Sequence, residues 1–87
     1  MSAEERVTER QYLRGLGKRI KLLRIDRELS QEQLAKASGM SRNFVSSVER
    51  GAHGVDVVRL VRLAAALDVD VAVLVSNPPD RPGVMTG

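Results

Sequence analysis

The sequence predicts an all-α fold, a compact bundle of four to five short helices. Apolar residues recur at intervals of three and four along most of the chain, which is the period of an amphipathic helix. Residues that favour helix N-caps, Ser30, Ser41 and Asp56, precede three of these runs. Because 2% of the 87 residues are aromatic, we expect an aliphatic core that fills one small domain.

The first helix is predicted from the apolar residues between Leu13 and Leu29, whose spacing puts them on one face. Residues 1–11 are polar, and we expect a flexible tail or a loosely held start to this helix. Thr8 and Gln11 have the spacing of a capping box, so the helix could begin there. The side opposite the apolar face carries a basic stripe formed by Arg10, Arg14, Lys18 and Lys21. This stripe is either a solvated surface or one that binds phosphates.

Two short helices follow in quick succession. The first is predicted over residues 31–37 and begins with a capping box formed by Ser30 and Gln33. Gly39 can adopt the left-handed conformation that ends a helix. The second helix is predicted over residues 41–50. Because three residues separate the two helices, they must pack at a steep angle, which is the geometry of a helix-turn-helix.

A fourth helix is predicted over residues 57–67, with Asp56 as its N-cap. The loop before it contains His53, for which two interpretations remain open, an ordinary loop residue or a phosphate contact. The residues of the fourth helix that we expect to face inward are Val57, Leu60, Val61, Leu63, Ala64 and Leu67.

The segment 69–75 fits two structures. Its β-branched residues alternate in a period of two, which favours a strand that would pair with the same strand of a second chain. The alternative is a short fifth helix capped by Asp70. Residues 77–87 contain three prolines and are expected to be a disordered tail, so the predicted domain spans residues 12–76.

Residues 31–50 resemble the helix-turn-helix of the phage-repressor/Cro-like (Xre-type) family of DNA-binding regulators. The resemblance extends over about residues 13–75. The sequence departs from the family pattern just before the fourth helix, where Val55 occupies a position that is often proline in the family. The residues that match the family pattern are Gln31, Leu34, Ala35, Gly39, Met40, Val45, Val48, Glu49, Arg50 and Gly51.

The resemblance implies that the helix over 41–50 lies in the major groove of double-stranded DNA, with its N-terminal residues at base edges. Arginine can pair with guanine and asparagine with adenine. It also implies a structural ion pair between Arg24 and Glu49. The base contacts that we expect are made by Arg42, Asn43 and Ser47. Contacts to the DNA backbone or sugars are expected from Gln31, Ser41, Phe44, Ser46 and Arg50. For Phe44, a place at the edge of the core is the other interpretation.

The function implied is that of a sequence-specific transcriptional regulator. One such helix covers about four base pairs, so we expect a homodimer on a pseudo-palindromic operator. A different class of function also fits, an antitoxin-type or restriction-modification controller protein that acts partly through a protein partner, a toxin or another regulator. The residues that we expect at the dimer interface are Val69, Val71, Val73 and Val75.

Composition argues against other classes of protein. There is no cysteine and one histidine, so we expect no disulfide, metal site or cofactor. No phosphate-binding glycine loop or catalytic motif is present, so an enzyme is not expected. The first residues contain no apolar signal core and the longest apolar run, 71–75, is too short for a bilayer, so we expect a cytoplasmic protein without a membrane partner. The net charge of +3 permits a polyanionic partner without requiring one.

Overall fold

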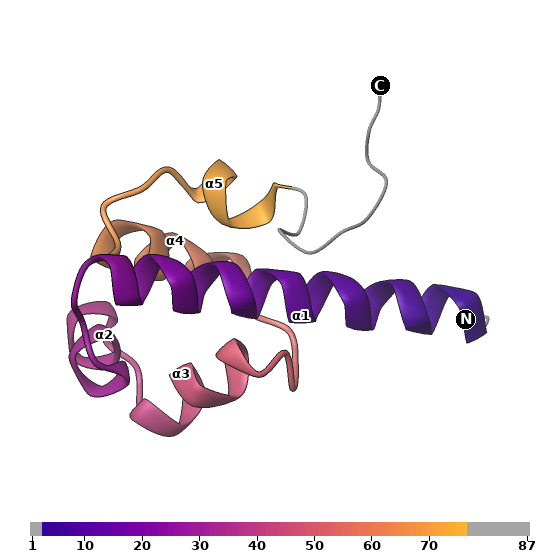
Figure 1. Cartoon of the computed structure of the whole chain (residues 1–87), viewed down its shortest axis with the longest axis horizontal. Helices are drawn as coiled ribbons and strands as arrows, with labels where there is room; N and C mark the ends of the chain where they lie inside the picture. Colours follow the sequence, from indigo (N-terminus) through magenta and orange to yellow (C-terminus); the bar gives the residue numbers. More distant parts are fainter. Residues whose placement is uncertain (1–2, 77–87) are drawn as a thin grey trace.

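The computed structural model describes residues 3–76, which form five α-helices and no strand (Figure 1). The all-α prediction is therefore confirmed. The shorter helices gather around the C-terminal half of the first one, whose N-terminal half extends past them (Figure 1). None of these helices is long and apolar enough to cross a membrane. The helices are α1 (Ala3–Asp26), α2 (Gln31–Ser38), α3 (Arg42–Glu49), α4 (Val57–Ala66) and α5 (Val71–Val75).

The start of α1 corrects one prediction. From Ala3 onward the presumed tail is helical, so residues 3–11 are the start of the first helix, and Thr8 lies inside it rather than at its cap. Glutamate and arginine, which are frequent here, are good helix formers, so a polar composition is no obstacle to a helix. The helix ends at Asp26, earlier than its apolar pattern suggested. The predicted disordered tail, 77–87, lies outside the described residues.

The segment 69–75 contains a helix, not a strand. The Asp70 carboxylate accepts a hydrogen bond from the backbone N–H of Ala72 at 2.9 Å and caps α5. This helix buries Leu74 against the other helices. A lone strand would have left its backbone N–H and C=O groups without hydrogen-bond partners. A capped helix provides these partners within the segment and still places one leucine in the core.

The turn between α2 and α3 is built from local interactions. Ser30 Oγ accepts a hydrogen bond from the backbone N–H of Gln33 at 3.0 Å, and Gln33 Oε1 accepts one from the N–H of Ser30 at 2.8 Å. Gly39 ends α2 with a φ of 72°, in the left-handed region. Ser41 Oγ then caps α3 by accepting from the N–H of Phe44 at 3.1 Å. The predicted capping box and turn are confirmed.

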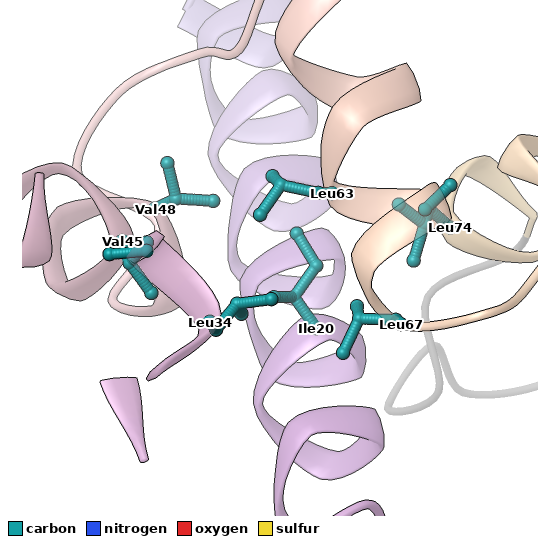
Figure 2. Close-up of a cluster of buried hydrophobic side chains, with 9 residues drawn as sticks. Ile20, Leu34, Val45, Val48, Leu63, Leu67 and Leu74 are labelled. Atoms are coloured by element: carbon teal, nitrogen blue, oxygen red, sulfur yellow. The ribbon is translucent and has the colours of Figure 1, made fainter. Parts of the chain in front are cut away.

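The core is a small aliphatic cluster to which every helix contributes (Figure 2). Burying one such side chain contributes about 1.5–3 kcal/mol. Two residues of α4 expected in this core are not there: the exposed fraction is 72% for Val57 and 50% for Val61. The face of α4 that packs on the core is therefore narrower than predicted. The largest fully buried side chains are Ile20, Leu34, Val45, Leu63, Leu67 and Leu74.

A backbone contact joins α1 to α3. Gly17 is buried in α1 at the point where the two helices meet. A Cβ atom at this position would lie 2.3 Å from the carbonyl oxygen of Val48 and 2.6 Å from that of Glu49. These distances are well below van der Waals contact, so the helices approach this closely because residue 17 has no side chain.

A charged network reinforces the same junction. Arg24 Nε donates to Glu49 Oε2 at 2.6 Å, and Arg24 Nη2 donates to Oε1 at 3.1 Å. Gln31 Nε2 also donates to Oε1 at 3.0 Å, and Arg24 Nη1 donates to the Leu29 carbonyl at 2.8 Å. The side chains of Arg24 and Glu49 are 12% and 3% exposed. The Glu49 carboxylate thus connects α1, α2 and α3 in a nearly dry environment.

We expect Gly17→Ala to lower the free energy of unfolding by about 1–3 kcal/mol, because the added methyl group would overlap the α3 backbone. The higher helix propensity of alanine, about 1 kcal/mol, offsets part of the loss. Urea denaturation measures the change. Gly54→Ala is the control, since nothing lies within 4 Å of a Cβ there. A Gly17→Ala protein with wild-type stability would contradict the close approach.

We expect Glu49→Ala to lower the free energy of unfolding by about 3–5 kcal/mol, because it leaves the largely buried Arg24 guanidinium without its carboxylate. Chemical denaturation at pH 7 measures the loss. Asp26→Ala breaks an ion pair with Arg27 in which Asp26 is exposed, and should change stability by at most about 1 kcal/mol. Equal losses in the two variants would show that burial of the Glu49 pair has no energetic consequence.

Candidate nucleic-acid interface

The first turn of α3 presents two polar side chains to solvent. Arg42 and Asn43 directly follow the N-cap Ser41, and both are exposed. Within residues 3–76 neither side chain has a hydrogen-bond partner. Val45 and Val48, on the other side of the helix, are buried in the core and fix the rotation of α3 about its axis. The two side chains are therefore held on the outside of an anchored helix, where their donors and acceptors are available.

The outer face of α3 continues through two half-buried serines to its C-cap. Arg50 folds back along the helix, where Nη1 donates to Ser46 Oγ at 2.5 Å and Nη2 donates to Ser47 Oγ at 3.3 Å. The positive charge of Arg50 therefore lies against the two serine hydroxyls, and Arg42 adds a second positive charge at the N-terminal end of the helix.

Gln31 occupies the first position of α2, as predicted, but its side chain is not free. Its amide donates to Glu49, as described above, and the residue is half-buried. Sequence reasoning assigned this amide a phosphate contact and missed its bond to Glu49. The backbone N–H groups of the first turn of α2 lie beside it, at the positive end of that helix.

The Phe44 ring contacts two side chains, those of His53 and Arg59, that sequence reasoning did not connect with it. Its ring centroid is 5.3 Å from that of His53, with the planes tilted by 44°. The guanidinium carbon of Arg59 lies 5.2 Å from the same centroid. Arg59 Nη1 also donates to Asp56 Oδ2 at 2.5 Å. The spacing of Asp56 and Arg59 on one helix is a signal for their ion pair, whereas nothing in the sequence signals the contacts with Phe44.

The electrostatics of this cluster are set by α4. The backbone N–H of Arg59 donates to Asp56 Oδ1 at 2.9 Å, and this N-cap bond, together with the Arg59 side chain, lowers the pKa of the Asp56 carboxyl below its ordinary value. Asp56 therefore carries a negative charge at neutral pH. The cluster carries one fixed positive charge, one fixed negative charge and one histidine.

The four valines proposed for an interface divide into two pairs. Val69 and Val71 are half-buried and pack against the core of their own chain. Val73 and Val75 are exposed, at 37% and 56%. The exposed valines of α4, which packs against α5, are Val57, Val58 and Val61.

The basic stripe on α1 is a separate surface. Its four residues, Arg10, Arg14, Lys18 and Lys21, are all exposed, as both interpretations of the stripe require.

Comparison with known proteins relates these helices to one family of proteins. The family whose model matches is described as helix-turn-helix, and the match covers residues 20–74. Among solved structures, the restriction-modification controller protein C.AhdI from Aeromonas hydrophila has 44% sequence identity and a TM-score of 0.70. The likeness covers 71% of this chain and 94% of that one.

Two curated relatives come from a bacterium and a phage. A hypothetical transcription factor from Neisseria meningitidis is 36% identical over 77% of this chain. The immunity repressor protein of Bacillus phage phi105 is 35% identical over 71% of it. The matches span 63% and 43% of the lengths of these two relatives. Since the family match covers more than half of the chain and includes both helices of the motif, the resemblance seen in residues 31–50 is confirmed, and the chain belongs to the helix-turn-helix family.

Proposed function

We propose that this chain is a sequence-specific regulator of transcription that binds double-stranded DNA with α3 in the major groove. The observation that carries the proposal is the outer face of α3, on which Arg42 and Asn43 stand exposed while the opposite face is locked into the core. An α-helix with its side chains is about 10–12 Å across and the groove is about 12 Å wide, so such a face can meet base edges.

The polar groups of α3 support an assignment of contacts. Arg42 would donate to the O6 and N7 atoms of a guanine, and Asn43 would pair with the N6 and N7 atoms of an adenine. Ser47 would reach a third base once Arg50 releases its hydroxyl. The remaining contacts, to phosphates or sugars, are assigned to Gln31, Ser41, Phe44, Ser46 and Arg50. Binding DNA in this way requires neither a catalytic group nor a cofactor. We also propose that the protein acts in the cytoplasm.

A homodimer on a pseudo-palindromic operator follows from the small reach of one helix, about four base pairs. The surface that we assign to the dimer is the set of exposed valines on α4 and α5. Large apolar side chains on two neighbouring helices are typical of an association surface. Val69 and Val71 are assigned to the core of each subunit, because that is where they pack. The interface residues are then Val57, Val58, Val61, Val73 and Val75.

Control of a restriction-modification system is the second candidate, favoured by the 44% identity with the controller C.AhdI. It would use the same DNA contacts, so the two candidates differ in the genes controlled. A restriction endonuclease gene beside the gene for this chain would support it. Stable co-purification with a second protein would instead support a role that depends on a partner, such as that of an antitoxin.

The experiment that tests the main proposal is selection from a randomised duplex library, followed by a salt titration on the enriched site. We expect an enriched inverted repeat and a steep fall of affinity with salt, because phosphate contacts release counterions. Weak binding to all sequences, abolished by modest salt, would contradict the proposal and would point to a protein partner.

We expect Arg42→Ala and Asn43→Ala each to weaken binding to the enriched site by about 1–3 kcal/mol and to relax preference at one base position. The reason is the loss of a bidentate pair to one base. Competition between the enriched duplex and single-base variants measures both effects. Lys36→Ala, an exposed residue of α2, is the control for loss of a surface charge. Variants that lose affinity equally for every duplex would show that these residues do not read bases.

We expect Val61→Glu to shift the protein from dimer to monomer, because it places a charge in an apolar interface. Sedimentation equilibrium, with and without the enriched duplex, measures the change. Leu22→Glu is the matched control, since Leu22 of α1 is equally exposed but lies outside the proposed interface. If the wild-type chain stays monomeric at high concentration even on DNA, the dimer proposal fails.

A further inference from the structure

The outward side of α1 carries two exposed apolar side chains. Leu22 and Ile25 are 51% and 52% exposed, and residues three positions apart on a helix are neighbours on its surface. Ile20 and Leu23, on the other side of α1, lie in the core or pack against it. In Figure 1, α1 runs between α4 and α5 on one side and α2 and α3 on the other. Leu22 and Ile25 are therefore left open to solvent.

Basic side chains border this apolar pair. Lys18 lies one turn before Leu22, Lys21 lies one turn before Ile25, and Arg14 extends the row by a further turn. All three cations are exposed, and within residues 3–76 their side chains have no ion-pair or hydrogen-bond partner. The surface that these five residues form, Arg14, Lys18, Lys21, Leu22 and Ile25, is called the α1 patch.

Positive charge is concentrated on this part of the chain. Residues 8–21 contain five lysines and arginines and one acidic residue, Glu9, whereas the net charge of all 87 residues is +3. The remaining residues together are thus slightly acidic. Asp26, the acidic residue that follows the patch in the sequence, pairs with Arg27. The α1 patch therefore attracts a negatively charged partner.

The apolar pair decides which class of partner fits. The DNA backbone offers phosphates and sugars to the cations but would leave Leu22 and Ile25 without an apolar surface to cover them. A second copy of this chain is unfavourable, because a two-fold axis brings the same patch to both sides and sets lysine against lysine. A protein helix with apolar residues at intervals of three and four, and carboxylates beside them, complements both features.

We propose that the α1 patch is the docking site for an acidic amphipathic helix of a second protein. The apolar residues of that helix pack against Leu22 and Ile25, and its carboxylates pair with Arg14, Lys18 and Lys21. From residue 14 to residue 25 the patch is about 16 Å long, or about three turns, so a partner helix of about 12 residues covers it.

This docking site is separate from the surfaces of the proposed function. It contains no residue of α3, which is assigned to DNA, and the valines assigned to the dimer belong to α4 and α5. Binding of the partner helix therefore needs neither DNA nor the dimer surface. A regulator bound to its operator would carry the partner protein to that position on the DNA.

The first test uses a synthetic peptide helix as the probe, with leucines along one face and glutamates beside them. Its binding to the isotope-labelled full chain is followed by NMR, and we expect the shifted amide signals to lie in residues 14–26. Lys18→Gln combined with Lys21→Gln should weaken binding by about two- to fivefold for each ion pair lost. Leu22→Ser should weaken it as well, because an apolar contact is lost.

The charge-matched control is Lys36→Gln combined with Arg62→Gln, two exposed cations on α2 and α4. Thermal denaturation establishes that each variant is folded. Equal weakening in the control would show that the peptide responds to net charge alone and would overturn the docking site. Shifted signals on α4 and α5 in place of α1 would overturn it too.

The second test identifies the natural partner. A photo-crosslinking amino acid replaces Leu22 in the host cell, and mass spectrometry identifies the crosslinked peptide, with the same amino acid at Lys36 as the background. We expect a segment of a second protein that is acidic and has apolar residues at helical intervals, and the crosslink should be lost when Lys18→Gln and Lys21→Gln are added. Crosslinks to DNA, to a second copy of this chain or to a segment without these features, or no crosslink at all, would overturn the proposal.

DNA binding separates this docking site from the proposed function. Lys18→Gln combined with Lys21→Gln should bind the enriched duplex as tightly as the charge-matched control. A larger loss, with a shallower dependence on salt, would show that the patch binds phosphates and would overturn the docking site while the proposed function stands. If the wild-type chain binds no duplex in a sequence-dependent manner, the proposed function fails, and the peptide and crosslinking results still decide the docking site.

Discussion

The contact between α1 and α3 is the constraint on which the rest of the molecule depends. An isolated helix of eight residues is not stable in water, so α3 owes its existence and its orientation to tertiary packing. Gly17 lets the two backbones touch, and the Glu49 carboxylate binds Arg24 and Gln31 beside that point. Together they hold the C-terminal end of α3, while Val45 holds its buried face. A short helix thereby becomes a rigid support for the side chains at its other end.

This arrangement also joins the three helices into one cooperative unit. Glu49 accepts hydrogen bonds from α1 and from α2, and it is itself the last residue of α3. Opening α1 or α3 would leave a buried charge unpaired, which is strongly unfavourable, and opening α2 would remove the Gln31 hydrogen bond from the same carboxylate. The motif should therefore open as a whole or not at all, in contrast to the N-terminal half of α1, which extends past the other helices (Figure 1).

Local chemistry explains what could be predicted from the sequence. Ser30, Ser41 and Asp56 cap helices through bonds to residues three positions away, and Gly39 takes the conformation that its lack of a side chain allows. The resemblance supplied the pairing of the distant residues Arg24 and Glu49. Tertiary packing decided the exposure of Val57 and Val61 and the meeting of His53 and Arg59 at Phe44. The helical start at residue 3 follows instead from the local helix propensity of the glutamates and arginines there. No short-range pattern encodes which neighbours a side chain meets across a loop.

The separation between the anchored and the exposed faces of α3 has an evolutionary consequence. Arg42 and Asn43 make no hydrogen bond within residues 3–76, so exchanging them for other polar residues removes no interaction that holds the fold together. The residues that keep α3 in place, in contrast, tolerate little change. In the proposed complex, new operator preferences can therefore arise by single substitutions at the outer face without loss of stability, and the same scaffold can diverge among many targets.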